Sequence, residues 1–199
     1  MARAAGYCDW HANSIDFAAP PPYRRALMSE TATLIPLDNV DTALVEALLD
    51  RAFEPERHTR TAYKLREGLD WLPALSFAAI NADDQLVGTI QCWPVALTTL
   101  AGKAHPLIMV GPVAVLPEVQ GLGFGQALMS ASLSALSPEA PLPQVMIGDP
   151  EYYGRFWGFS AQHTAGWAMP GPYDPHRLLA RCDNPAVLPK LGMLGPWLR

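Results

Sequence analysis

The sequence predicts a single α/β domain, and three observations support that fold class. The chain has 199 residues, of which 50% are apolar and 17% are charged, the composition of one globular domain with a sizeable core. Strand patterns alternate with helix patterns from about residue 28 to residue 183. An apolar run at Leu107–Leu116 leads through closely spaced glycines into a helical pattern, which is the order of a strand-to-helix crossover.

The first half of the domain reads as a strand, two helices and a meander. Its expected elements are strands over 31–37, 74–80 and 86–95, and helices over 40–53 and 59–68. Asp38 or Asn39 can cap the first helix, and Gly68 can end the second. Asn81–Asp84 forms the hairpin turn, and Pro94 indicates that the following strand ends at an edge or a bulge.

The second half continues the alternation around the apolar run. We expect strands over 107–116, 144–149, 159–169 and 177–183, a helix from residue 126 and a short helix after residue 149. Residues 1–27 lack periodicity and contain three consecutive prolines, which predicts a flexible arm; Met28 is a candidate natural start, and an arm that covers a neighbour is the alternative. Residues 184–199 hold three prolines and two glycines, which predicts an irregular tail.

Charge and cysteine content exclude several classes of function. The formal charge is −5 and the pI is near 5.4, so no basic surface favours binding to nucleic acid or to a membrane. No run of eighteen apolar residues is present. The cysteines, Cys8, Cys92 and Cys182, lack metal-like spacing. The plain interpretation is a metal-free protein with reduced thiols in the cytoplasm.

The glycines after the apolar run are the most informative feature. Gln120-Gly121-Leu122-Gly123-Phe124-Gly125 ends where a helical pattern begins at Gln126. Unpaired N–H groups at a helix start, together with the helix dipole, form a ready site for phosphate or pyrophosphate. The alternative is that the glycines only allow a tight turn between strand and helix.

Two other nucleotide motifs fit this stretch poorly. A dinucleotide fingerprint requires Gly-x-Gly-x-x-Gly, but the spacing here is Gly121-x-Gly123-x-Gly125. It also requires an acidic residue about twenty positions later at the end of a second strand, and Glu139 lies between prolines in an expected loop. A phosphate-binding loop of the Walker type fails because no Lys follows the glycines.

Several motifs, in the correct order, resemble the GNAT superfamily of N-acetyltransferases. Gln120-x-x-Gly123-x-Gly125 resembles the loop that holds the pyrophosphate of coenzyme A in that family. The segment at 148–159 resembles the Gly-Asp-Pro-x-Tyr-Tyr-x-Arg-Phe-Gly-Phe motif of a bacterial GNAT subgroup, as do the runs at 63–68 and 111–115. The resemblance covers about residues 28–183, and Trp157 is an extra residue relative to the subgroup.

The resemblance implies a mixed, mostly antiparallel sheet that splays at its central parallel strand pair and is flanked by helices. It implies that acetyl-CoA, the acetyl donor, lies along the central strand and in the glycine loop. The cofactor-binding residues would then be Val113, Ala114, Val115, Gln120, Gly121, Leu122, Gly123, Phe124, Gly125 and Gln126. Gly111-Pro112 would interrupt the strand as a β-bulge and open the splay.

The resemblance also implies a tyrosine that protonates the departing thiolate. Tyr153 and Tyr152 are both candidates, because Trp157 makes the alignment of this helix ambiguous, and either ring could instead fill the core. The central strand carries no carboxylate, so no general base is identified; His105 and Asp149 border the region.

A basic segment lies where the family places the acceptor site. Arg57, Arg60 and Lys64 share one face of the expected helix, which suits an anionic acceptor or a solvated surface balanced by neighbouring glutamates.

The sequence therefore predicts an acetyl-CoA-dependent N-acetyltransferase that transfers directly to a primary amine, with a homodimer as a candidate assembly. A non-catalytic acyl-CoA-binding module is the alternative, and a nicotinamide oxidoreductase is a distant third.

Overall fold

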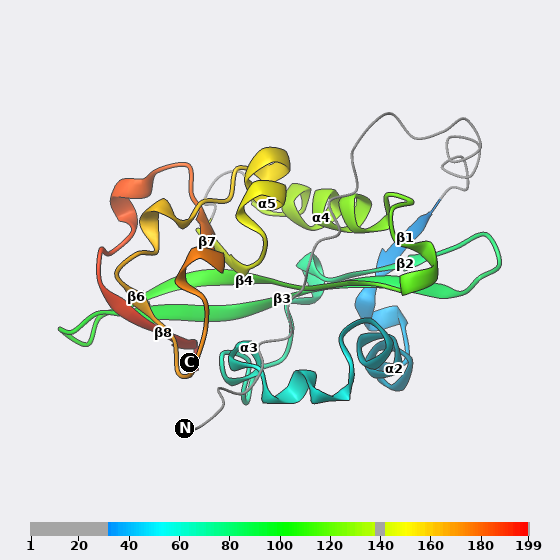
Figure 1. The fold of residues 1–199 in the computed structure, drawn as a ribbon, viewed down its shortest axis with the longest axis horizontal. Helices are drawn as coiled ribbons and strands as arrows, with labels where there is room; N and C mark the ends of the chain where they lie inside the picture. The colour runs from blue at the N-terminus through cyan, green and yellow to red at the C-terminus, as the bar shows by residue number, and fades with distance from the viewer. Residues whose placement is uncertain (1–31, 138–141, 199) are drawn as a thin grey trace, which may run out of the picture.

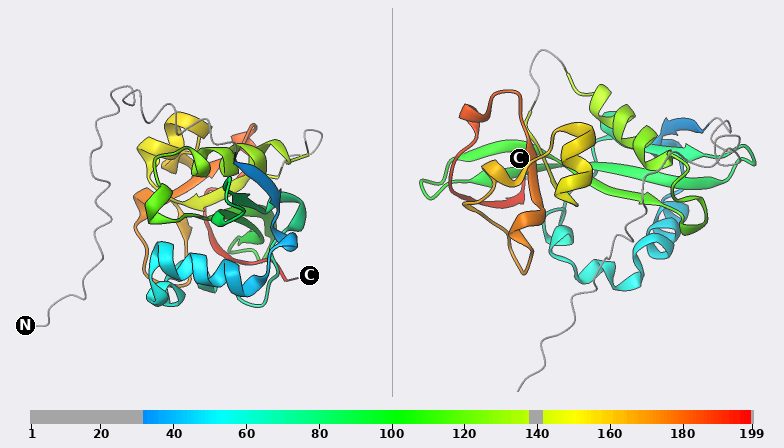
Figure 2. Two further views of the ribbon diagram at one scale, coloured as in Figure 1. Left: turned by 90° about the vertical axis from the view of Figure 1, so that its right-hand side faces the viewer. Right: turned by 45° about the horizontal axis from the view of Figure 1, so that its top comes forward.

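One open sheet separates two layers of helices in the computed structural model, which describes residues 32–137 and 142–198. Helices α4 and α5 cover one face, and α2 and α3 cover the other (Figures 1 and 2). The helices are α2 (Thr42–Phe53), α3 (Thr61–Lys64), α4 (Phe124–Ser134) and α5 (Pro150–Trp157). The strands are β1 (Thr33–Pro36), β2 (Phe77–Ile80), β3 (Leu86–Thr98), β4 (Ala104–Val115), β5 (Gln144–Ile147), β6 (Trp167–Ala168), β7 (Leu178–Arg181) and β8 (Gly192–Pro196).

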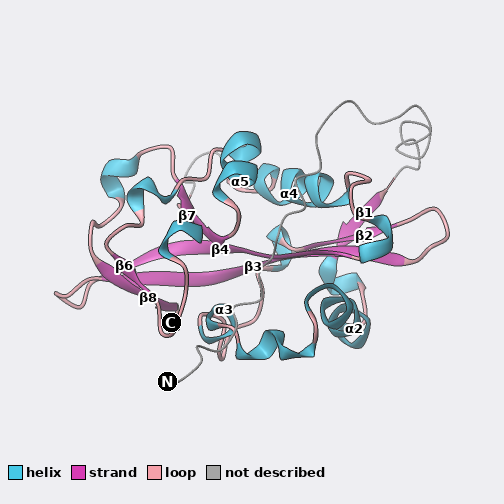
Figure 3. Ribbon diagram, viewed as in Figure 1, coloured by secondary structure: helices cyan, strands magenta, loops and turns pink. Residues whose placement is uncertain are grey.

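The sheet runs in the order β1-β2-β3-β4-β5-β7, and Figure 3 shows its strands as the layer between the helices. The pair β4–β5 is parallel, and every other neighbouring pair along this path is antiparallel. Strand β8 pairs with the distal half of β3 and, in parallel, with β6. The predicted fold class is confirmed: a single mixed α/β domain whose open sheet is flanked by helices.

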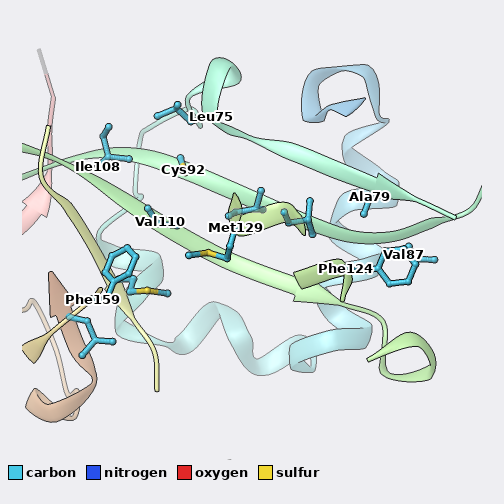
Figure 4. Packing of buried hydrophobic residues seen from close by; sticks show 13 residues of the cluster. Leu75, Ala79, Val87, Cys92, Ile108, Val110, Phe124, Met129 and Phe159 are labelled. Carbon is cyan, nitrogen blue, oxygen red and sulfur yellow. The ribbon is translucent and has the colours of Figure 1, made fainter. Parts of the chain in front are cut away.

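Alternation along the long strands divides the core between the two faces. Ile108 and Val110 of β4 belong to the cluster beneath α4, with Met129 of that helix (Figure 4). Leu107 and Met109, one position away, belong to a second cluster on the other face. This period of two is what a strand buried on both sides requires.

The first half of the chain differs from the predicted elements at two helix starts. Residues 37–39 form a 3₁₀ turn, so α2 begins later and Asp41 caps it, accepting a hydrogen bond from the Ala43 N–H at 2.8 Å. The second predicted helix is a 3₁₀ turn at Pro55–Thr59 followed by the four-residue α3. Its expected single basic face is therefore absent.

Strand boundaries also differ. Strand β3 continues through Pro94 to Thr98, so the predicted end of that strand is wrong. The expected strand over 159–169 contains a 3₁₀ turn at Ala161–His163 and only the two residues of β6. The predicted irregular tail contains β8, because Leu194 is buried in the core and its strand supplies a partner to β3. The predicted arm at 1–27 lies outside the described residues.

Candidate functional site

Strands β4 and β5 part shortly after they meet. Their parallel pairing is limited to Ile108 with Gln144 and Met109 with Val145. Beyond that point β4 pairs with β3 alone, while β5 continues beside β7. The backbone of β4 from Val110 onward therefore faces a gap in the sheet ladder, where its N–H and C=O groups are open to another extended chain.

A β-bulge lies at the opening. Gly111 and Pro112 of β4 stand opposite the single residue Gln91 of β3, because the register shifts between the pairs Ile90–Val113 and Cys92–Val110. Gly111 has a φ of +121°, a conformation that L side chains rarely adopt. The predicted bulge at this position is confirmed.

The bulge also reverses which residues of β4 face each helical layer. Before it, Val110 packs under α4; after it, Val113 and Val115 do so, while Ala114 packs on the α2 side. The three predicted binding residues on β4 thus lie directly beyond the point where the two strands part.

The glycine loop follows β4 and begins α4. Gly121 and Gly123 have φ values of +80° and +91°, and Gly123 is the N-cap of α4 with no side chain capping the helix. Among the described residues, the N–H groups of Phe124, Gly125 and Gln126 have no acceptor. The helix start therefore presents a row of free donors, as an anion site requires.

Gln120 fixes this loop to the strand. Its side-chain amide donates to the Val115 carbonyl at 3.2 Å, which joins the start of the loop to the last residue of β4. Gln120 thus stabilises the conformation of the loop by anchoring it to the end of β4. Leu122 packs against the cluster beneath α4.

The two candidate tyrosines differ in their surroundings on α5. Asp149 caps that helix, accepting from the Tyr152 N–H at 2.8 Å, so its carboxylate has a structural role. The Tyr152 hydroxyl hydrogen-bonds the Gln126 side chain in the first turn of α4. The half-buried Tyr153 packs on Gly148, where an added Cβ would lie 2.6 Å from its ring. Its hydroxyl has no partner within the described part of the chain.

Burial raises the pKa of both phenols. The pKa of Tyr153 rises to about 12, first through burial and then through the neighbouring Tyr152. Burial also raises the pKa of Tyr152, and the hydrogen bond from Gln126 opposes that shift. Both groups therefore remain protonated at neutral pH and can donate.

A cavity of about 430 Å³ lies on the opposite face of the sheet, between α2, α3 and β3. Its lining is Glu46, Leu49, Arg57, His58, Tyr63, Lys64, Arg66, Glu67, Leu69, Trp71, Gln91 and Trp93. Gln91, the residue opposite the bulge, joins this cavity to the place where β4 leaves β5. His105 lies near the start of β4, about six residues or roughly 20 Å along the strand from the bulge.

The basic segment is divided between structural and cavity-lining residues. Arg57 is 2% exposed and pairs with Glu46 at 2.5 Å and Asp50 at 2.7 Å. Arg60 is exposed and donates to the Phe53 carbonyl at 3.0 Å, away from the cavity lining. Lys64 lines the cavity. The sequence placed the buried Arg66 only within the basic segment and the run at 63–68, without a role of its own. It gave no signal for Gln91, the other buried polar residue of the lining.

Comparison with known proteins agrees with this geometry. The family model described as "Acetyltransferase (GNAT) domain" matches residues 34–160, more than half of the chain. The chain belongs to the GNAT acetyltransferase family. The match extends from β1 past α5, so it includes the glycine loop and both tyrosines.

Relatives by sequence carry acetyltransferase names. The chain is 29% identical over 144 residues to "Uncharacterized N-acetyltransferase YhbS" of Escherichia coli strain K12, covering 70% of this chain and 83% of that protein. It is 31% identical over 144 residues to the mycothiol acetyltransferase of Streptomyces griseus, covering 62% of this chain and 44% of that protein.

Solved structures share the GNAT fold. E. coli YhbS in complex with CoA superposes with a TM-score of 0.65 at 24% identity, covering 85% of this chain and 91% of that one. A GNAT acetyltransferase from Brucella melitensis in complex with acetyl-CoA gives a TM-score of 0.55 at 24% identity, covering 83% and 96%.

The described residues hold neither a cluster of metal-ligating side chains nor a helix suited to crossing a membrane. Across residues 32–137 and 142–198, no three His, Cys, Asp or Glu side chains are grouped so that they could hold a metal ion. No helix within those ranges has both the length and the apolar character needed to cross a membrane.

Proposed function

We propose that this GNAT protein is an acetyl-CoA-dependent N-acetyltransferase that moves an acetyl group directly to a primary amine. The observation that carries the proposal is the parting of β4 from β5 beside a helix start with free N–H donors. Membership of the family, and neighbours of the same fold that bind CoA or acetyl-CoA, support it.

The cofactor would use two backbone surfaces. The pyrophosphate would accept hydrogen bonds from the loop and first turn, Gln120 to Gln126, where the helix dipole favours negative charge. The pantetheine arm would lie as an extended chain against Val113, Ala114 and Val115, whose ladder has no partner on the β5 side. An N–H of that edge could then polarise the thioester carbonyl.

The reaction needs no covalent enzyme intermediate. The lone pair of the neutral amine attacks the thioester carbonyl carbon, forming a C–N bond and a tetrahedral oxyanion. Collapse breaks the C–S bond, the thiolate leaves and takes up a proton, and the amide nitrogen loses one to solvent. Binding both reactants in one complex supplies the orientation that makes this step fast.

Tyr153 is our proposed proton donor to the thiolate. Its helix follows β5 directly, its hydroxyl makes no other hydrogen bond among the described residues, and its raised pKa keeps it protonated. Tyr152 is the alternative, although its hydroxyl is already bonded to Gln126. A thiol has an ordinary pKa near 8.5, well below that of a phenol. The phenol can therefore donate its proton only while the thiolate is forming or is poorly solvated.

Two measurements test this function. Calorimetry should show acetyl-CoA binding, and a panel of primary amines should release free CoA thiol in proportion to amide product. Saturable acetyl-CoA binding with no thiol release for any amine would favour the non-catalytic acyl-CoA-binding module. The cytoplasmic location and a homodimer remain predictions from the sequence.

A further inference from the structure

Two buried arginines line the cavity under the bulge, but only one is neutralised. Burial by itself lowers the pKa of Arg57, yet hydrogen bonds to Glu46, Asp50 and Tyr63 more than compensate and raise it. Its charge is therefore used within the protein, where it joins the 3₁₀ turn to α2.

Arg66 has no carboxylate partner, and its charge interacts with the Tyr63 side chain instead. It is 7% exposed, and no carboxylate of the described residues lies within 4.0 Å of its guanidinium. Its Nε donates to the Ala62 carbonyl at 3.3 Å, and its guanidinium carbon lies 3.9 Å from the Tyr63 ring centroid and 5.2 Å from that of Trp93. Burial lowers the pKa of this guanidinium, and the Tyr63 phenol only partly opposes the shift.

Two polar side chains of the same cavity lack hydrogen-bond partners. The side-chain amide of Gln91, in a residue that is 2% exposed, makes no hydrogen bond within the described ranges. The indole N–H of Trp93 is buried and also has no acceptor there. A buried polar group left unpaired is costly, so these two groups, beside a guanidinium that lacks a carboxylate, indicate a missing ligand.

We propose that the cavity binds an amine that carries a carboxylate, an amino acid in the broad sense, with Arg66 as the carboxylate-binding residue. This inference rests on the proposed acetyl transfer, because it makes the cavity the acceptor site. The planar guanidinium offers two parallel N–H donors to a carboxylate, and stacking on Tyr63 holds its plane. Trp71 and Trp93, edge to face at 6.2 Å, supply apolar walls.

The cavity favours a singly charged acid over a phosphate. Its lining holds three cationic side chains, Arg57, Lys64 and Arg66, against two carboxylates, Glu46 and Glu67. The single excess positive charge matches one carboxylate, whereas a doubly charged phosphate would exceed it. Gln91 directs the rest of the molecule toward the bulge, where β4 separates from β5 and the acetyl group would lie. The acid would thus bind on the α2 side of the sheet, with its amine toward the opening between β4 and β5.

The test compares matched acceptors. Glycine, β-alanine, L-phenylalanine and L-lysine would each be assayed beside its amide by thiol release with acetyl-CoA. The amine of an amide is less basic and more of it is neutral at the assay pH, so intrinsic reactivity favours the amide. We expect kcat/KM to be at least about tenfold higher for an acid than for its amide, as a lost charge-assisted hydrogen bond would give.

The variant Arg66→Gln should remove this preference. It should lower kcat/KM for the acid about ten- to a hundredfold and change the amide little, while acetyl-CoA affinity stays the same. Arg60→Gln, which removes an equal charge nearby but outside the cavity lining, should retain the preference. Arg66→Lys, which keeps the charge without the planar fork, should recover part of it and also serves if Arg66→Gln fails to fold.

Distinct outcomes separate this inference from the proposed reaction. Three results would overturn the carboxylate site. The wild type could use acids and amides with equal kcat/KM, or Arg66→Gln could lose kcat/KM equally for both. The third is a preference of the wild type for O-phosphoethanolamine over the acids. If no amine releases thiol, the proposed reaction fails, and titration of tryptophan fluorescence with L-phenylalanine and L-phenylalaninamide decides the inference. Tighter binding of the acid, lost in Arg66→Gln, would then support it, and equal binding would refute it.

Discussion

At the scale of single residues, two adjacent hydroxyl groups on α5 differ in what remains free to react. The Tyr152 hydroxyl is bonded to Gln126 and so ties α5 to the first turn of α4. The Tyr153 ring is held between Gly148 and Phe159, and its hydroxyl is unbonded among the described residues. A fixed ring with a free hydroxyl is what a proton donor needs.

Replacing Tyr153 by Phe keeps the ring packing and removes only the donor. We expect turnover to fall about a hundredfold with acetyl-CoA affinity unchanged, because general acid help is typically of that size. Steady-state thiol release and calorimetry measure the two effects. If Tyr152→Phe shows the loss and Tyr153→Phe does not, the donor is Tyr152; if neither does, the thiolate leaves without help from α5.

The raised pKa of Tyr153 also predicts how stability depends on pH. With an ordinary pKa of 10.0 in the unfolded chain and about 12 in the folded one, the unfolded state loses its proton first. Between pH 10 and 12 the folded state therefore binds more protons, and stability falls as pH rises, by on the order of 2 kcal/mol from this group. Urea midpoints should fall less steeply for Tyr153→Phe; parallel slopes would show that Tyr153 is not the group.

Gly123 combines an unusual backbone with the proposed phosphate site. An L residue at its φ of +91° costs about 1–2 kcal/mol, and its side chain would crowd the free N–H groups. We expect Gly123→Ala to weaken acetyl-CoA binding at least about tenfold, as measured by calorimetry. Gly102→Ala is the control: its φ is +77° in a remote hairpin turn with no atom within 4 Å of an added Cβ. Equal affinity in both variants would refute the loop assignment.

At the scale of elements, a buried arginine and two partly exposed carboxylates form an ion pair that joins α2 to the 3₁₀ turn leading into α3. Glu46 and Asp50 lie one turn apart on α2, and both reach Arg57. The pair therefore fixes one wall of the cavity that contains Arg66. An exposed ion pair, Arg51 with Glu118 at 2.5 Å, joins the end of α2 to the segment after β4.

Removing both carboxylates should strongly destabilise the domain. Glu46→Gln with Asp50→Asn leaves the Arg57 charge buried and unpaired, which typically costs about 3–5 kcal/mol. Denaturant unfolding measures the change. Glu118→Gln, which breaks only the exposed pair, should leave the midpoint unchanged, since surface pairs are weak and screened. A similar midpoint for all variants would show that the Arg57 pair adds nothing to stability.

Local pattern predicted the elements that are regular and missed those set by distant contacts. The hairpin at Asn81–Asp84 follows from turn chemistry, since the Asn81 side chain accepts from the N–H groups of Asp83 and Gln85. The short α3 and the strand β8 do not follow from the local sequence, because each is fixed by packing against β3 and its neighbours. The predicted strand end at Pro94 was wrong because Pro94 stays in the β3–β4 ladder opposite Ile108, and its carbonyl accepts from the Trp197 N–H at 3.2 Å.

At the scale of the whole molecule, the two ends of the chain should differ in importance. Removing residues 1–27 should leave melting temperature and acetyl-CoA affinity unchanged, because that segment has no periodic apolar face. Removing 192–199 should lower the melting temperature by many degrees, because it deletes β8 and Leu194, which is 1% exposed. Thermal unfolding of both truncations is the measurement; a large loss on removing 1–27 would show that the arm packs on the domain.

The site could be predicted only where chemistry lies in consecutive residues. The glycine loop and the bulge follow from Gln120–Gly125 and Gly111-Pro112, where local geometry limits the residue types. The cavity could not be predicted, because Gln91 and Arg66 come together only through the packing of α3 on β3. Arg60 was predicted to share a face with Lys64 because a continuous helix was assumed, and the 3₁₀ turn before α3 moves it away from the cavity lining.

The opening between β4 and β5 lies between two compartments, with the glycine loop on the α4 side and the cavity on the α2 side. Each reactant would then have its own entrance, and neither would have to leave before the other enters. Initial-rate plots should intersect, as for a ternary complex, and a ping-pong pattern should not appear. A single molecule joining the sulfur of CoA to an amino acid would pass through the opening and contact both compartments. Because binding of the second half becomes intramolecular, the two binding free energies combine, and the joined molecule would be a far stronger inhibitor than either half.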